Sequence, residues 1–136
     1  MTDQPQVGVV LVSHSRDVAE SVARLATELA AGGATAPAVA AGGTPDGGLG
    51  TSAELIAHAA RRADRGAGVV LLADLGSAVL TVRTLLAEGD ELPPGARLAD
   101  APFVEGAVAA LVTASAGADA AAVAAAAEEA YTYRKT

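Results

Sequence analysis

Two apolar segments without polar alternation constrain the fold of this chain more than any other feature. Residues 6–12 end in Val-Val-Leu-Val, and residues 68–73 read Gly-Val-Val-Leu-Leu-Ala. Apolar runs of this length are typical of strands that are buried on both faces of a parallel sheet. A helical pattern follows each run, and strands that alternate with helices indicate βαβ units. We therefore expect an α/β protein.

The remaining segments complete one expected domain over residues 1–136. Ser52 suits the N-cap of the second helix, and Gly32 and Gly33 end the first one. Apolar residues at helical spacing mark that first helix: Val18, Val22, Leu25 and Leu29. The pattern predicts strands near residues 6–13, 36–41, 68–73 and 97–101, and helices near residues 17–31, 52–65, 78–87, 104–114 and 119–133. We expect a three-layer open sheet, mainly parallel, with helices on both faces.

Composition and charge exclude several classes of function. The chain has no cysteine, which excludes disulfides, iron–sulfur clusters and cysteine nucleophiles. No apolar run reaches the roughly 18 residues that span a membrane, and the first residues do not read as a signal peptide, so we expect a cytoplasmic protein with no membrane partner. The net charge is −7, aromatic residues make up 2%, and Lys135 is the only lysine. Nucleic acid is therefore not an expected partner.

Three strand-to-helix turns are expected to meet at one edge of the sheet. His14 and Ser15 follow the first strand, the glycine-rich segment 42–51 follows the second, and Asp74-Leu75-Gly76-Ser77 follows the third. Right-handed crossovers place such turns at the carboxyl ends of the strands, where open α/β sheets bind ligands. These residues are far apart in the sequence but are predicted to converge.

His14 and Asp74 form the candidate chemical pair. Imidazole has an unperturbed pKa near neutrality, so a histidine at this edge is a candidate general base, metal ligand or phosphoryl acceptor. A carboxylate can bond one ring nitrogen, fix the tautomer and leave the other nitrogen free as a nucleophile. The alternatives are that Asp74 simply caps the third helix and that His14 is a satisfied polar group at a strand end.

Ser77 and its neighbour Gly76 open the third helix, where free backbone N–H groups and the helix dipole favour an anion. Ser77 is therefore either an N-cap or part of a cradle for a phosphoryl group on His14. The glycine-rich segment lacks the Gly-Lys-Ser/Thr of a P-loop, and residues 44–48 are interpreted as a mobile surface loop. His58, in the middle of the second helix, is interpreted as a surface or packing histidine. With only two histidines, a multi-histidine metal site is excluded.

The chain resembles the phosphotransferase subunit of the bacterial dihydroxyacetone kinase that depends on the phosphoenolpyruvate phosphotransferase system, DhaM, which is similar to the mannose-type enzyme IIA domain. The resemblance covers nearly the whole chain. It is carried, in family order, by Leu11-Val12-Ser13-His14-Ser15, Ala40-Ala41-Gly42, Gly50-Thr51, Asp74-Leu75-Gly76-Ser77-Ala78, Ala101-Pro102-Phe103-Val104-Glu105-Gly106 and Ser115-Ala116-Gly117-Ala118-Asp119.

The resemblance implies the mannose-type enzyme IIA fold and a set of roles. It implies that His14 is phosphorylated, that Asp74 orients its ring, and that Ser77 helps to hold the phosphoryl group. It also implies that the donor is the phosphocarrier HPr and that the acceptor is ADP bound on DhaL, for phosphorylation of dihydroxyacetone on DhaK. The chain would then be a transferase without a cofactor of its own. One departure is Ser52, where family members often have Asp.

Two further expectations concern assembly and alternatives. The alanine-rich core and the short fourth strand, which leaves a sheet edge, predict a homodimer, as the resemblance also implies. The first alternative function is a mannose-type enzyme IIA of a sugar permease. The second is a regulatory module that signals through its phosphorylation state. The Asp-Leu-Gly-Ser-Ala turn favours the dihydroxyacetone system over the permease.

Overall fold

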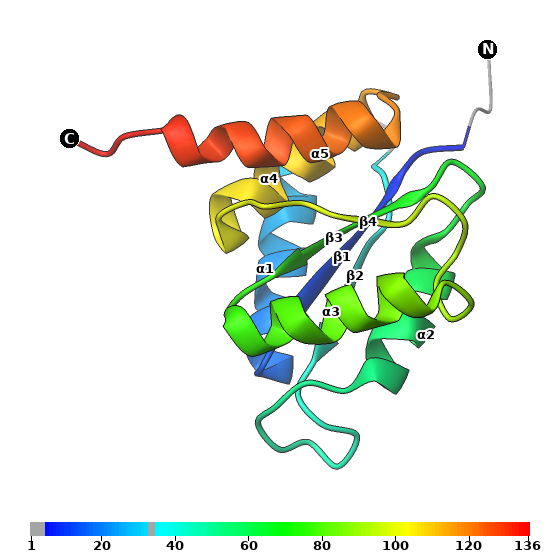
Figure 1. Cartoon of the computed structure of the whole chain (residues 1–136). Helices are drawn as coiled ribbons and strands as arrows, with labels where there is room; N and C mark the ends of the chain where they lie inside the picture. The colour runs from blue at the N-terminus through cyan, green and yellow to red at the C-terminus, as the bar shows by residue number, and fades with distance from the viewer. Residues whose placement is uncertain (1–4, 33–34) are drawn as a thin grey trace.

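A four-stranded parallel sheet forms the centre of the protein, in a computed structural model that describes residues 5–32 and 35–136. The strands are β1 (Gly8–Ser13), β2 (Ala38–Gly42), β3 (Val69–Ala73) and β4 (Arg97–Leu98). The helices are α1 (Arg16–Ala30), α2 (Ala53–Ala63), α3 (Gly76–Glu88), α4 (Phe103–Ser115) and α5 (Ala120–Glu129), followed by a short 3₁₀ helix, Ala130–Thr132. Figure 1 shows their arrangement.

The strand order is β2-β1-β3-β4, and every pairing is parallel. The central strand β1 is buried along its whole length. Its side chains alternate between the two faces, with Val9 and Leu11 in one apolar core and Val10 and Val12 in the other. This two-sided burial explains why the sequence of β1 shows no polar alternation.

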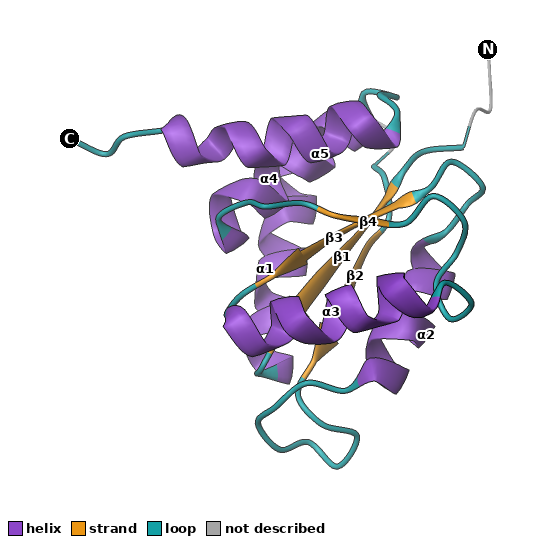
Figure 2. Ribbon diagram, viewed as in Figure 1, coloured by secondary structure: helices purple, strands orange, loops and turns teal. Residues whose placement is uncertain are grey.

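Helices cover both faces of the sheet, as the sequence predicted (Figure 2). One core lies between the sheet and helices α1, α4 and α5, and the other lies between the sheet and helices α2 and α3. The expected three-layer α/β fold is thus confirmed. In the described part of the chain, no helix has both the length and the apolar character needed to cross a membrane.

Several predicted boundaries are wrong by a few residues. Strand β4 is only two residues long rather than residues 97–101, and it pairs only at Val70↔Arg97 and Leu71↔Leu98. Helix α3 begins at Gly76 rather than at residue 78, and helix α2 ends at Ala63 with Asp64 as its C-cap. Helix α1 ends at Ala30, and Gly33, one of the two glycines expected to end it, lies outside the described residues.

Helix α1 packs through a different face from the one that its large apolar residues suggest. Its buried residues are Ala19, Val22, Ala23 and Ala26, whereas Val18, Leu25 and Leu29 are exposed. Alanine side chains let the helix approach the sheet closely, so small residues line the contact and the larger ones lie outside it. Only Val22 of the four apolar residues that marked the helix is buried.

Candidate functional site

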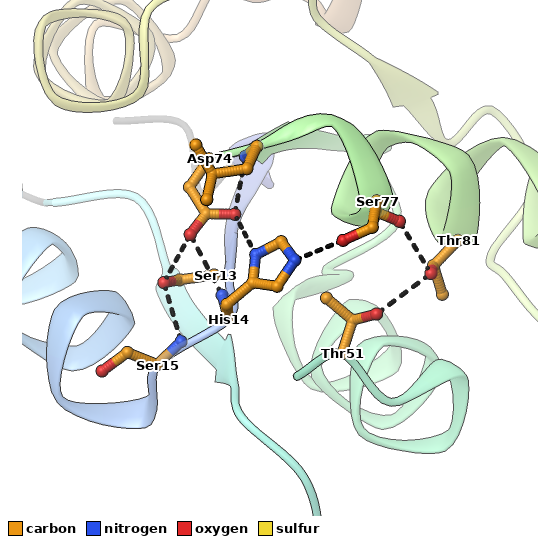
Figure 3. A network of polar contacts seen from close by, with 8 residues as sticks. Ser13, His14, Ser15, Thr51, Asp74, Ser77 and Thr81 are labelled. Atoms are coloured by element: carbon orange, nitrogen blue, oxygen red, sulfur yellow. Dashed lines mark hydrogen bonds and ion pairs between the residues drawn. The ribbon is translucent and has the colours of Figure 1, made fainter. Parts of the chain in front are cut away.

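The strand register brings the three strand-to-helix turns together at one edge of the sheet. Ser13 pairs with Gly42 of β2, and Val12 pairs with Ala73 of β3. His14 therefore leaves β1 beside the start of the glycine-rich segment on one side and beside Asp74 on the other. Figure 3 shows the resulting polar network, in which His14 lies between Asp74 and Ser77.

The imidazole ring of His14 is held at both nitrogens. Its Nδ1 lies 3.0 Å from Asp74 Oδ1, and its Nε2 contacts the Ser77 hydroxyl. The backbone of His14 is fixed as well, because its N–H donates to Asp74 Oδ2 at 3.0 Å and its carbonyl accepts from Gly50 N–H at 2.9 Å. About a quarter of the side chain stays accessible, at 25% exposure. The ring is therefore oriented but reachable from solvent.

The Asp74 carboxylate accepts hydrogen bonds on both oxygens. Oδ1 accepts from Leu75 N–H at 2.7 Å in addition to the His14 ring, and Oδ2 accepts from the Ser13 hydroxyl at 2.9 Å in addition to His14 N–H. Burial raises the pKa of Asp74, but the hydrogen bonds from His14 and Ser13 lower it by a larger amount. The pKa of Asp74 therefore lies below its usual value. The carboxylate stays ionised and accepts from Nδ1–H.

Asp74 is not the cap of helix α3, which removes the first alternative reading of this residue. The N-cap is Leu75, and no side chain caps that helix. By contrast, side-chain caps begin helices α1, α2 and α5: Ser15, Ser52 and Asp119. The contacts at both ring nitrogens are also those of the second alternative, a satisfied polar group at a strand end, so this geometry leaves that alternative in place.

Ser77 is the second residue of helix α3 rather than its N-cap. Its hydroxyl faces His14 Nε2, and its carbonyl accepts from the Thr81 hydroxyl at 3.0 Å. The Thr81 hydroxyl also lies 3.1 Å from the hydroxyl of Thr51, at the end of the glycine-rich segment. These contacts connect the turn after β2 to the start of α3 on the far side of the histidine.

The glycine-rich segment 42–51 supports the backbone around His14. Gly43 N–H donates to the Ser13 carbonyl at 3.1 Å, and a Cβ on Gly42 would lie 2.4 Å from the Ser15 carbonyl oxygen. Glycine is therefore required for β2 to end so close to the start of α1. The tip of the segment folds into a hydrogen-bonded turn between Thr44 and Gly48, with the expected surface placement.

Sequence reasoning assigned no role to Ser13, Thr51 or Thr81. All three carry a hydroxyl at the same edge of the sheet as His14, and Ser13 is the buried polar residue that ends an otherwise apolar strand. That single polar residue was the signal available for Ser13. The contact between Thr51 and Thr81 depends on the tertiary packing and has no sequence signal.

His58 lies apart from this network, as predicted. It is an exposed residue of helix α2, near Arg16 and Arg62 in a small surface hollow of about 150 Å³. Within residues 5–32 and 35–136, no group of three or more histidine, aspartate or glutamate side chains is arranged so that it could bind a metal ion. A larger hollow of about 740 Å³ is lined in part by Asp74, Leu75 and Gly76, and its lining does not include His14.

The arrangement suits nucleophilic chemistry at His14 Nε2. Because the ionised Asp74 accepts from Nδ1–H, the neutral ring keeps its lone pair on Nε2. The Ser77 hydroxyl donates to that lone pair and would lie beside any group bonded there. The uncapped start of helix α3 adds the positive end of a helix dipole on the same side.

Comparison with known proteins gives one family. Residues 8–124 match the sequence profile of EIIA-man, described as the PTS system fructose IIA component. The PEP-dependent dihydroxyacetone kinase 2, phosphoryl donor subunit DhaM, of Listeria innocua serovar 6a is 37% identical over 107 residues, which make up 78% of this chain and 84% of the relative.

Two longer relatives carry similar names. The PEP-dependent dihydroxyacetone kinase, phosphoryl donor subunit DhaM, of Escherichia coli K12 is 36% identical over 115 residues, and the protein of that name from Pantoea ananatis is 40% identical over 118 residues. Each match covers 83% of this chain but only 24% of the relative. Among solved structures, the crystal structure of EF1359, a protein of unknown function, has a TM-score of 0.79 and 29% identity, with 93% of this chain and 95% of that chain covered.

Proposed function

From two findings we propose that this chain is a phosphoryl carrier for a PEP-dependent dihydroxyacetone kinase. The chain belongs to the EIIA-man family, the PTS system fructose IIA component, and its relatives include phosphoryl donor subunits of such kinases. His14 accepts the phosphoryl group from HPr and passes it to ADP bound on DhaL, and the resulting ATP serves DhaK for the phosphorylation of dihydroxyacetone. The observation that carries this proposal is the His14 ring, which Asp74 orients at Nδ1 and which stays 25% exposed as a side chain.

The inward transfer uses the lone pair of His14 Nε2. The lone pair attacks phosphorus on the phosphohistidine of HPr, the new N–P bond forms, and the N–P bond of the donor breaks with its electron pair returning to the donor ring. The His14 ring then carries positive charge, because Nδ1 keeps its proton. The Asp74 carboxylate, 3.0 Å from Nδ1, stabilises that charge.

The outward transfer reverses these roles. A terminal oxygen of ADP attacks phosphorus, the N–P bond on His14 breaks, and the electron pair returns to Nε2. The Ser77 hydroxyl, which contacts Nε2 in the unloaded protein, donates to a phosphoryl oxygen in the loaded one. The backbone N–H groups at the uncapped start of helix α3 support the same charge.

The carrier needs no nucleotide or metal of its own in this scheme. ADP arrives on the partner, and His14 relays one phosphoryl group at a time. Exposure of the histidine at the sheet edge, outside the 740 Å³ hollow, supports this division because two different proteins must reach the same atom.

The test is phosphorylation of the purified protein with labelled phosphoenolpyruvate, enzyme I and HPr. We expect label on the native protein that is lost in acid and kept in base, as for a phosphoramidate. His14→Ala should not be labelled, whereas His58→Ala, which removes the other histidine from the surface of α2, should be labelled normally. Acid-stable label, or label on His14→Ala, would contradict the proposal.

A second stage of the experiment distinguishes the dihydroxyacetone system from a sugar permease. The sugar permease is the alternative because the family is described as a fructose IIA component. Dihydroxyacetone phosphate should form only when phosphoenolpyruvate, enzyme I, HPr, this protein, DhaK and ADP-loaded DhaL are all present. Transfer to the IIB component of a sugar permease but not to DhaL would favour the permease. Product formed from ATP by this chain alone would contradict both functions.

A further inference from the structure

Ser13 ends the central strand β1 in an environment that usually excludes polar groups. It is 1% exposed, and in the described part of the chain it is the one polar residue classed with the fully buried side chains. A buried hydroxyl destabilises a fold unless its hydrogen bonds are made. Here both are made, and one of them goes to the carboxylate that orients His14.

The direction of the Ser13 hydroxyl is fixed by its two neighbours. Ser15 N–H donates to Ser13 Oγ at 3.0 Å, which occupies a lone pair of that oxygen. An ionised Asp74 can only accept, so the single hydroxyl proton of Ser13 points to Asp74 Oδ2, 2.9 Å away. Donation from the amide strengthens the outgoing bond, because hydrogen bonds in a chain polarise one another.

We infer that Ser13 is a positioning residue, which holds the Asp74 carboxylate in the one orientation that keeps Oδ1 on His14 Nδ1 and thereby keeps the lone pair of the ring on Nε2. The carboxylate receives donors on both oxygens, so it cannot rotate without breaking bonds. Removal of the Ser13 hydroxyl leaves Oδ2 with His14 N–H alone and loosens this constraint. The consequence for transfer rests on the proposed function.

A purely structural role would look different. In that case the contact between Ser13 and Asp74 would only tie the end of β1 to the end of β3, and its loss would lower the stability of the fold without changing the ring. Ser115 provides the matched comparison. Its hydroxyl accepts from the backbone N–H of Ala36 at 2.9 Å, two residues before β2 begins and so at the opposite end of the sheet from His14.

The experiment compares native protein with Ser13→Ala, Ser13→Thr and Ser115→Ala in the full chain. Nitrogen-15 NMR of the unphosphorylated protein reports the fraction of His14 with the proton on Nδ1, and carbon-13 NMR reports the pKa of the Asp74 carboxyl. In Ser13→Ala we expect the Nδ1–H fraction to fall and the pKa of Asp74 to rise from its lowered value. Phosphorylation by HPr should slow about tenfold, the usual effect of losing one hydrogen bond to a charged group.

Ser13→Thr keeps the hydroxyl and should restore the tautomer and most of the rate, while Ser115→Ala should change neither. If Ser13→Ala lowered only the unfolding free energy, with the tautomer and the pKa of Asp74 as in the native protein, the inference would be overturned. The tautomer is measured without any phosphoryl donor. A shifted tautomer in Ser13→Ala would therefore support the inference even if the native protein accepted no phosphoryl group, which would count against the proposed function alone.

Discussion

At the scale of single residues, an imidazole carries a phosphoryl group well only if one nitrogen is reliably deprotonated and the other is balanced by charge. In this protein Asp74 serves both needs from one position, 3.0 Å from Nδ1. An asparagine there keeps the shape but loses the negative charge, and its amide group cannot accept from His14 and Ser13 on both sides.

Asp74→Asn should therefore fold but transfer phosphoryl groups slowly. We expect the rates of both phosphorylation and dephosphorylation to fall by roughly 10- to 100-fold, as loss of a charge-assisted hydrogen bond predicts. Rapid-quench measurement with phosphorylated HPr gives both rates. The matched control is Asp90→Asn, an exposed aspartate just beyond helix α3. If Asp74→Asn kept the phosphorylation and dephosphorylation rates of the native protein, the Asp74 carboxylate would have a structural role only.

The same carboxylate should contribute to stability in a pH-dependent way. Its pKa in the folded protein lies below the usual value near 3.8, despite the opposing effect of burial, because His14 and Ser13 bond the ionised form. The stabilisation is present above the unfolded-state pKa and is lost as pH falls through the folded-state pKa. Urea denaturation of native protein and Asp74→Asn should show a difference in unfolding free energy that shrinks between about pH 5 and pH 2. A difference independent of pH would contradict this assignment.

At the scale of elements, the site depends on how the turn after β2 contacts the start of helix α3. Thr81 makes this contact, because its hydroxyl donates to the Ser77 carbonyl and also meets the Thr51 hydroxyl. Thr84, one turn further along, donates in the same way to the Leu80 carbonyl within the helix. Both threonines make the same bond within the helix; Thr81 is half-buried and makes the bridge, whereas Thr84 is exposed.

Thr81→Val should lower the transfer rate a few-fold and destabilise the protein by about 1 kcal/mol, the usual net effect of a lost hydrogen bond. Thr84→Val, which loses only the bond within the helix, should leave the rate unchanged. Stopped-flow transfer and urea denaturation measure the two effects. Equal rates in the two variants would show that the bridge does not position Ser77.

Sequence patterns predicted the elements whose signals are local. The apolar runs located β1 and β3, Ser52 marked the start of α2, and the turns after the strands placed His14 beside Asp74. The start of α3 was placed two residues late because no side chain caps that helix. The contacts of Ser13 were not predictable, since they depend on the register that sets Val12 beside Ala73.

The packing faces of the helices were the least predictable feature. Large apolar residues normally mark the buried face, yet in α1 alanine lies against the sheet and Leu25 and Leu29 face outward. With alanine dominating the apolar composition, the size of a side chain no longer tells which face is buried. The exposure of Val18, Leu25 and Leu29 is therefore not explained by packing within one chain.

At the scale of the whole molecule, two helices that cover one face of the sheet each expose several apolar side chains. Helices α1 and α4 pack against each other on the same face, and both expose apolar side chains: Val18, Leu25 and Leu29 from α1, and Val104 and Val112 from α4. Exposed apolar side chains that lie close together mark an interaction site. A second copy of the chain, which the small alanine-rich core also favours, would cover them.

We therefore predict a homodimer in which the outer face of α1 and α4 is buried. Light scattering at micromolar concentration should give twice the mass of the 13.2 kDa chain, and Leu29→Glu should shift the mass toward the monomer. Leu80→Glu is the matched control, because Leu80 is 64% exposed on helix α3, on the opposite face of the sheet, and Leu29 is 60% exposed. A dimer that survives Leu29→Glu would point instead to the open edge of the two-residue strand β4, where the unpaired backbone can accept another strand. A monomer mass for the native protein would contradict the prediction, and the apolar face of α1 and α4 would then need a different occupant.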